Sequence, residues 1–290
     1  MSSVPVVPSS RRTRIVEALR QRRDGRPQIM GILNVTPDSF HAASRVTGDA
    51  AIESGLRMLA DGATWLDIGG ESTRPGAEPV PVDEEMQRVV DIIAALRKAS
   101  SDAMLSVDTR RPVVAEAALA AGADLVNDVS GLRDPAMVEV VLAAQCGVCI
   151  MHMRGTPSTM QHETQYDDVV REVHAALHAT ASRLVERGHP SDLICLDPGI
   201  GFGKTHEQNL DLLRSGFELS QNGRWSVLWG VSRKSVVGHL TGREDTSERL
   251  PGTLGLAAVA FQQGVDLLRV HDVREHHDLL SAMQPFALRG

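Results

Sequence analysis

The stretch MGILNVTPDSFHAAS, residues 30–44, begins as a buried strand and turns polar within a few residues. Apolar side chains crowd its first half, while Asn34, Asp38 and Ser39 follow with a proline among them. Apolar runs of strand length recur along the chain, at 28–35, 64–69, 103–107, 124–129, 147–152, 193–197, 225–231 and 266–270. Short continuous apolar runs of this kind are typical of fully buried strands.

Segments with helical periodicity separate these runs. Within 82–99, apolar residues recur at spacings of three and four, namely Met86, Val89, Val90, Ile93 and Leu96. Several helical stretches are followed by a glycine, as helix C-termini often are, at Gly62, Gly122, Gly188 and Gly264. Strands that are hydrophobic on both faces and alternate with helices predict a parallel sheet of the α/β class.

Eight such units favour a closed (β/α)₈ TIM barrel over an open doubly wound sheet, because an open sheet would need more polar edge strands. GIGFGK at 199–204 has neither the Walker spacing nor the third Rossmann glycine. We expect one barrel over 28–290, preceded by a basic extension at 1–27 that forms a short amphipathic helix or a loose tail. An organelle transit segment is the alternative for this arginine-rich stretch.

Composition narrows the choice of partners and compartment. The net charge of -7 argues against a nucleic-acid partner that needs a broadly basic surface. A chain that is 42% apolar can bury a sizeable core, and no membrane association is expected. The odd number of cysteines, all in apolar runs, indicates reduced thiols and a cytoplasmic protein. Cys146 and Cys149 have the spacing of a zinc or redox pair, but they enter a strand and are predicted to fill the core.

Every predicted strand ends in polar side chains, which a barrel gathers at its C-terminal face. One group supplies positive charge and donors suited to a pyrophosphate and its metal. It comprises Asn34, Arg74, Arg269 and His271. A second group offers fixed donors and acceptors for a flat nitrogen heterocycle. It comprises Asp108, Asn127, Asp197 and Lys234.

Seven further blocks follow MGILNVTPDSF in order: DIGGESTRPGA, SVDT, NDVSG, MHMRGTPSTMQ, LDPGIGFGK, SRKS and RVHDV. Together they resemble the dihydropteroate synthase family of folate biosynthesis, from about Gln28 to the C-terminus. The resemblance implies a pterin-binding barrel that joins 6-hydroxymethyl-7,8-dihydropterin pyrophosphate to p-aminobenzoate and releases pyrophosphate. It also implies a homodimer that binds these small molecules.

The same resemblance implies a role for each matching residue. Mg²⁺ and pyrophosphate would be held by Asn34, with Thr73, Arg74, Arg269 and His271 around the anion. The pterin would contact Asp108, Asn127, Met151, Asp197 and Lys234. The p-aminobenzoate side would be formed by Phe40, Pro75, Phe202 and Ser235. The catalytic residues would be Phe40, Asp108, Lys234 and Arg269.

The first loop departs from the family pattern D-S-F-S-D-G-G, because residues 38–44 read DSFHAAS and Ala42 stands in place of the second aspartate. We expect this departure to change how the loop closes, the turnover rate and the selectivity for the arylamine. The alternatives to an ordinary synthase are therefore a sulfonamide-tolerant variant and a pterin-binding paralogue without catalysis. A cobalamin-linked methyltransferase of the same barrel type would leave the pyrophosphate group and SRKS unexplained.

Overall fold

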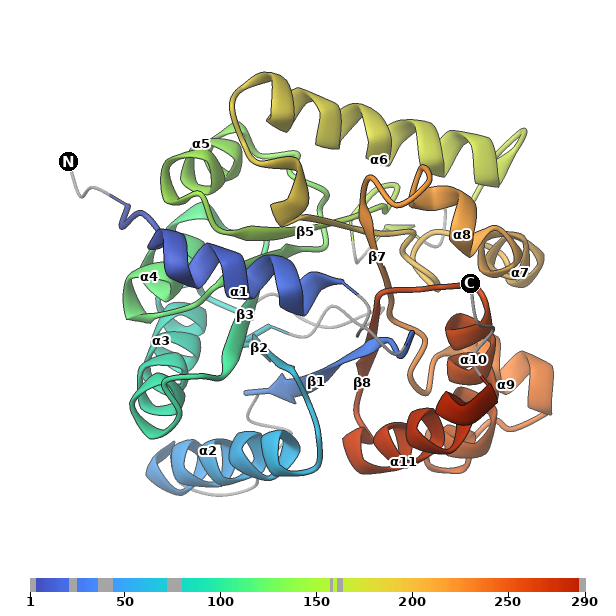
Figure 1. The fold of residues 1–290 in the computed structure, drawn as a ribbon, viewed down its shortest axis with the longest axis horizontal. Coiled ribbons are helices and arrows are strands. Elements are labelled where there is room, and N and C mark those ends of the chain that lie inside the picture. Colours follow the sequence, from blue (N-terminus) through green and yellow to red (C-terminus); the bar gives the residue numbers. More distant parts are fainter. Residues whose placement is uncertain are drawn as a thin grey trace.

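Eight parallel strands close into a barrel in chain order in a computed structural model, which describes residues 4–20, 25–35, 44–71, 80–156, 159–160 and 164–286 (Figure 1). The strands are β1 (Gln28–Asn34), β2 (Trp65–Gly69), β3 (Met104–Asp108), β4 (Leu125–Asp128), β5 (Gly147–Met151), β6 (Ile194–Asp197), β7 (Ser226–Trp229) and β8 (Leu267–Val270). Closure is completed by pairing of β1 with β8. The predicted TIM barrel is confirmed.

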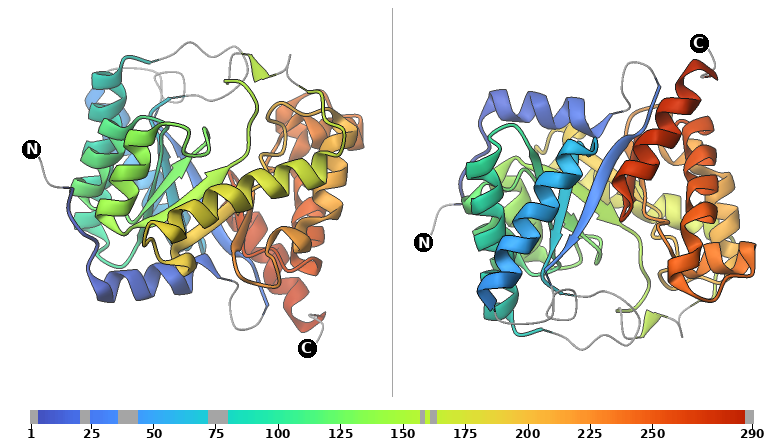
Figure 2. Two further views of the ribbon diagram at one scale, coloured as in Figure 1. Left: turned by 90° about the horizontal axis from the view of Figure 1, so that it is seen from above. Right: turned by 90° about the horizontal axis from the view of Figure 1, so that it is seen from below.

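Helices alternate with the strands and lie around the outside of the barrel (Figure 2). They are α1 (Ser9–Leu19), α2 (Ser44–Ala60), α3 (Val82–Ala99), α4 (Pro112–Ala121), α5 (Pro135–Ala144), α6 (Val169–Glu186), α7 (His206–Arg214), α8 (Gly216–Leu219), α9 (Ser235–Thr241), α10 (Leu250–Gln262) and α11 (Val273–Met283). Within the described residues, no helix is long and apolar enough to cross a membrane.

Helix α3 has the bounds that its periodicity predicts, and Val89, Ile93 and Leu96 are buried as expected. Glu85 is also buried on this helix, although a charged side chain was not expected there. It is paired by Arg111, whose Nη1 lies 2.7 Å from Glu85 Oε2. The predicted glycines after helices are confirmed, since all four have positive φ and Gly122 is the C-cap of α4 with φ 112°.

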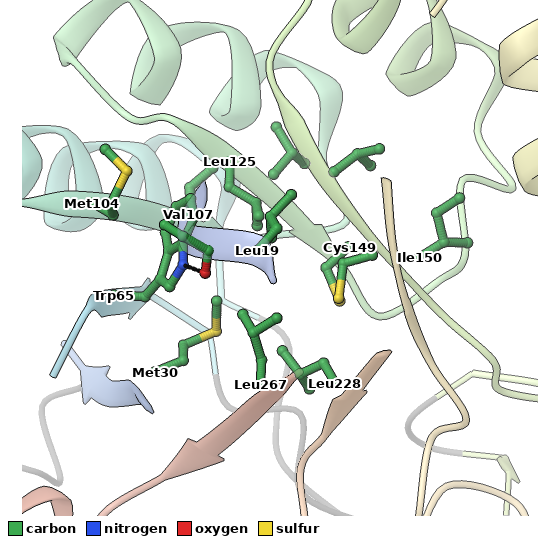
Figure 3. Close-up of a cluster of buried hydrophobic side chains, with 14 of the residues drawn as sticks. Leu19, Met30, Trp65, Met104, Val107, Leu125, Cys149, Ile150, Leu228 and Leu267 are labelled. Carbon is green, nitrogen blue, oxygen red and sulfur yellow. Dashed lines mark hydrogen bonds between the residues drawn. The ribbon is translucent and has the colours of Figure 1, made fainter. Parts of the chain in front are cut away.

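Helix α1 covers the N-terminal end of the barrel. Ile15 and Leu19 have no solvent-exposed surface, and the indole Nε1 of Trp65 donates to the carbonyl of Ala18 at 2.8 Å (Figure 3). Trp65 begins β2, so α1 packs across the end of the barrel opposite to the polar strand ends. The predicted amphipathic helix is confirmed, and the division at residue 27 stays a prediction.

Two arginines of α1, Arg11 and Arg14, bind acidic residues of the barrel. Arg11 makes two contacts with Asp124, at 2.5 and 2.7 Å, and Arg97 reaches the same carboxylate at 2.7 Å. Arg14 pairs with Asp102 at 2.6 Å. Asp102 and Asp124 lie in the loops just before β3 and β4. The arginines of α1 therefore attach the helix to loops at the N-terminal end of the barrel.

The cysteines are free thiols in the core, as predicted. Cys149 and Cys195 are register partners on β5 and β6, and neither is exposed. Burial raises the pKa of Cys146 to about 12. A thiol with so high a pKa carries almost no thiolate at neutral pH and is therefore unreactive.

Candidate functional site

The strands carry the predicted polar residues at their carboxyl ends. Asp108 is the last residue of β3 and pairs with Asn127 of β4. On the next two strands, Met151 at the end of β5 pairs with Asp197 at the end of β6. Asn34 ends β1 and is half-buried. Parallel strands place their carboxyl ends at one face, which is where TIM-barrel enzymes carry their active sites.

Arg269 of β8 joins two carboxylates across this face. Its Nε lies 2.6 Å from Asp67 Oδ2, and its Nη2 lies 2.6 Å from Asp108 Oδ2. Burial lowers the pKa of Arg269, but the two carboxylates outweigh burial and hold the pKa above its usual value. The resemblance places Arg269 around the anion, whereas its bonds here run to Asp108 of the pterin group and to Asp67. Two negative charges thus share one cation.

Asp67 supports a second site residue as well. It has no exposed surface, its Oδ1 accepts from Ser106 Oγ at 2.5 Å, and its Oδ2 accepts from Asn127 Nδ2 at 3.0 Å. This bond fixes the Asn127 amide with its nitrogen toward Asp67, so that the amide oxygen is left as an acceptor. No role was predicted for Asp67, which begins the DIGGESTRPGA block, or for Ser106, which begins SVDT. The one available signal was a polar residue inside an apolar strand.

Asp108 is a buried carboxyl group at the mouth of the barrel. Burial raises its pKa to about 7, with Asp67 adding to the rise and Arg269 opposing it. Its Oδ1 is buried without a partner among the described residues. A buried acceptor without a donor costs roughly 1–3 kcal/mol. A ligand that donates a hydrogen bond to Oδ1 would remove that cost.

Asp197 at the end of β6 and Lys234, which follows β7, form a second group at the mouth. Asp197 Oδ1 accepts from the backbone N–H of Gly199 at 2.7 Å, and Lys234 Nζ donates to the carbonyl of Ile200 at 2.7 Å. Burial raises the pKa of Asp197, although Lys234 opposes the rise. Burial lowers the pKa of Lys234 to about 8, and the charge of Asp197 limits the fall.

Lys204 ties the loop after β6 to the end of β5. Its Nζ donates to the carbonyls of His152, Gly199 and Phe202 at 3.2, 3.0 and 2.9 Å. Burial lowers its pKa to about 7. The sequence placed Lys204 in the LDPGIGFGK block, but its function as a loop anchor was missed because the acceptors are backbone atoms.

An apolar wall lies beside these charges. Met151 is buried in a small cluster with Val129, Met153 and Met160, against which Phe202 packs. The ammonium of Lys234 lies 4.5 Å from the centroid of the Phe202 ring, within cation–π distance. Such a wall suits the face of a flat ring.

The remaining predicted residues lie at the rim or outside the described residues. His271 follows β8, and its Nδ1 lies 3.0 Å from Ser232 Oγ. Ser235 is the exposed first residue of α9. Four predicted residues, and Ala42 of the altered loop, lie outside the described residues: Phe40, Thr73, Arg74 and Pro75.

Comparison with known proteins agrees with this geometry. Residues 30–271 match the family described as pterin binding enzyme. The chain is 42% identical over 267 residues to dihydropteroate synthase of Neisseria meningitidis serogroup C, covering 91% of this chain and 94% of that protein.

Solved structures are similar over the same length. The dihydropteroate synthase of Xanthomonas albilineans in complex with 7,8-dihydropteroate is 40% identical with a TM-score of 0.83, covering 93% of this chain and 97% of that chain. A Yersinia pestis dihydropteroate synthase in complex with a sulfonamide drug is 40% identical with a TM-score of 0.84, covering 91% of this chain and 96% of that chain.

Proposed function

The chain belongs to the pterin-binding enzyme family and is a dihydropteroate synthase. We infer below how the residues at the mouth of its barrel catalyse the synthase reaction. The enzyme is a transferase of folate biosynthesis. It condenses 6-hydroxymethyl-7,8-dihydropterin pyrophosphate with p-aminobenzoate, giving 7,8-dihydropteroate and pyrophosphate. The observation that carries the assignment of residues is the convergence of the Asp67–Arg269–Asp108 bridge with Asn127 at one mouth.

We propose that the pterin lies across this mouth on Met151. The Asp197 carboxylate can accept two parallel hydrogen bonds from an amino-pyrimidine edge, each worth roughly 1.5–3 kcal/mol when the acceptor is charged. Asn127 and Asp108 offer further acceptors, and Lys234 offers a donor. Support comes from the free acceptor Asp108 Oδ1 and from the Asn127 oxygen that the bond to Asp67 leaves open.

The chemistry follows from the charges. When the carbon–oxygen bond to pyrophosphate breaks, the electron pair leaves with pyrophosphate and a cation develops on the pterin methylene carbon. The anionic form of Asp108 stabilises that cation electrostatically. The arylamine nitrogen then forms the new bond and loses a proton, and it needs little activation beyond correct placement.

A magnesium ion is proposed at the pyrophosphate end. Proteins usually hold Mg²⁺ through one or two ligands together with substrate phosphates, and the Asn34 amide oxygen at the end of β1 fits that pattern. In the parts of the chain that are described, no group of three His, Cys, Asp or Glu residues could hold a metal alone. When bound, the ion would neutralise charge on the departing pyrophosphate. His271, held by Ser232, would assist around the anion together with Thr73, Arg74 and Arg269.

We propose that p-aminobenzoate binds on the Phe202 and Ser235 side, with Phe40 and Pro75 completing it. A sulfonamide would compete there, as suggested by the drug-bound relative from Yersinia pestis. The homodimer is supported only by the resemblance. The cytoplasmic location is supported by the three free, buried thiols.

The test is product formation from both substrates, followed as pyrophosphate release and as 7,8-dihydropteroate, with and without Mg²⁺. We expect both products in equal amounts, and loss of activity when Mg²⁺ is chelated. Pterin binding without product would instead support the non-catalytic alternative. Undiminished product formation at a sulfonamide concentration above that of p-aminobenzoate would identify a drug-tolerant variant.

A further inference from the structure

Arg233, the second residue of SRKS, has a left-handed backbone with φ 57°. This region is uncommon for residues other than glycine. Such a conformation persists only where its surroundings hold it, and next to a functional site it warrants a functional hypothesis. The residue that follows is Lys234, whose side chain enters the barrel mouth.

Three separate contacts hold Arg233. Its guanidinium pairs with both oxygens of Asp272, with Nε–Oδ2 at 2.9 Å and Nη2–Oδ1 at 2.5 Å. Its backbone N–H donates to Thr253 Oγ1 at 3.1 Å, and its carbonyl accepts from Arg249 Nη1 at 3.1 Å. A two-pronged arginine–carboxylate pair fixes direction as well as distance. The backbone N–H, the backbone carbonyl and the side chain of Arg233 are therefore all held by hydrogen bonds.

The pair joins two loops of the active face. Asp272 follows His271 after β8, while Arg233 follows β7. Ser232 and His271 make a second bond between the same loops, at 3.0 Å. The side chains of Arg233 and Asp272 are 33% and 14% exposed, so the pair is partly shielded from solvent. Within the described residues, Arg233 makes no contact with the charged groups inside the mouth.

We propose that Arg233 is a positioning residue for the reaction: its pair with Asp272 holds the left-handed turn that directs Lys234 at the pterin. This inference rests on the proposed contact between Lys234 and the pterin. Without the pair, the backbone of Arg233 can relax to negative φ, and the Cα–Cβ direction of Lys234 changes with it. The ammonium then leaves its place beside Ile200 and Phe202.

The first test compares two substitutions that both remove the ion pair. Arg233→Ala favours relaxation of the turn, whereas Arg233→Gly permits positive φ without a side chain. Calorimetry with 6-hydroxymethylpterin should give a dissociation constant about tenfold higher for Arg233→Ala, and Arg233→Gly should recover at least threefold of it. Equal losses would overturn the proposal. If Arg233→Ala does not fold, Arg233→Lys keeps the charge, loses the paired geometry, and should weaken binding at least threefold; unchanged binding would again overturn it.

The second test asks whether Arg233 acts through Lys234. In a Lys234→Met background, the further change Arg233→Ala should raise the dissociation constant by less than twofold, because the group it positions is already gone. A full additional tenfold loss would overturn the proposal. Lys234→Met with unchanged pterin binding would refute the Lys234 contact itself and the inference with it. The matched control is Arg187→Met, which breaks the exposed pair with Glu139 and should leave pterin binding unchanged.

Discussion

The substitution Asp67→Asn should lower the pKa of Asp108 without unfolding the barrel. The amide can donate to Ser106 Oγ, whose hydroxyl rotates, and its oxygen can still accept from Arg269 and Asn127. What disappears is a negative charge that raises the pKa of Asp108. Taking about 5 Å between the two carboxylates and an effective dielectric constant of about 20, Coulomb's law gives about 3 kcal/mol. That is about two pH units, so a downward shift of about one to two units is expected.

The assay is the pH dependence of kcat/KM, which reports groups of the free enzyme. The anionic form of Asp108 is the active one, so activity should rise with pH through about 7 in the wild type. In Asp67→Asn this acid limb should move to lower pH. The control Ser106→Ala removes one hydrogen bond and keeps the charge, so it should leave the limb in place. An unmoved or raised limb in Asp67→Asn would refute the electrostatic reasoning, as would an intact limb in Asp108→Asn.

Three further substitutions follow from the geometry. Asp197→Asn should weaken pterin binding about 100-fold or more in calorimetry, because charged hydrogen bonds worth roughly 1.5–3 kcal/mol each are lost; unchanged affinity would move the pterin elsewhere. Arg269→Ala leaves two buried carboxylates unpaired and should lower the free energy of unfolding by about 3–5 kcal/mol in urea titration, and a loss below about 1 kcal/mol would contradict the bridge. Leu19→Ala should cost about 2–5 kcal/mol in the same titration, while the control Val6→Ala, at a 61% exposed position, should cost little; equal losses would contradict the docking of α1.

The strands and the active face could be predicted from the sequence because both depend on local patterns. A strand buried on both faces must be continuously apolar, and the predicted bounds of all eight strands lie within two residues of those observed. Polar residues then have only the strand ends to occupy. That is why Asn34, Asp108 and Asp197 each end a strand, as expected.

The bonds inside the mouth could not be predicted in the same way. Asp67 and Arg269 are 202 positions apart, and their contact depends on closure of the barrel. Strand periodicity predicts which face a side chain occupies, but it does not predict which of several acids a guanidinium will bind. Glu85 was missed for a related reason, since its burial is compensated by Arg111 and by the Thr109 hydroxyl from the next loop. The helical periodicity alone predicts that a charged side chain at this position is exposed.

These bonds also explain how so many charges can lie close together around a neutral pterin ring. Arg269 offsets one of the two negative charges of Asp67 and Asp108. Lys234, which follows the neighbouring strand β7, is paired electrostatically with Asp197 of β6. The pKa of Asp108 is about 7 and that of Lys234 is about 8. The proposed chemistry needs Asp108 in its anionic form and Lys234 in its protonated form. The mouth then offers acceptors and a donor to the pterin and keeps one anion for the cation that forms when pyrophosphate leaves.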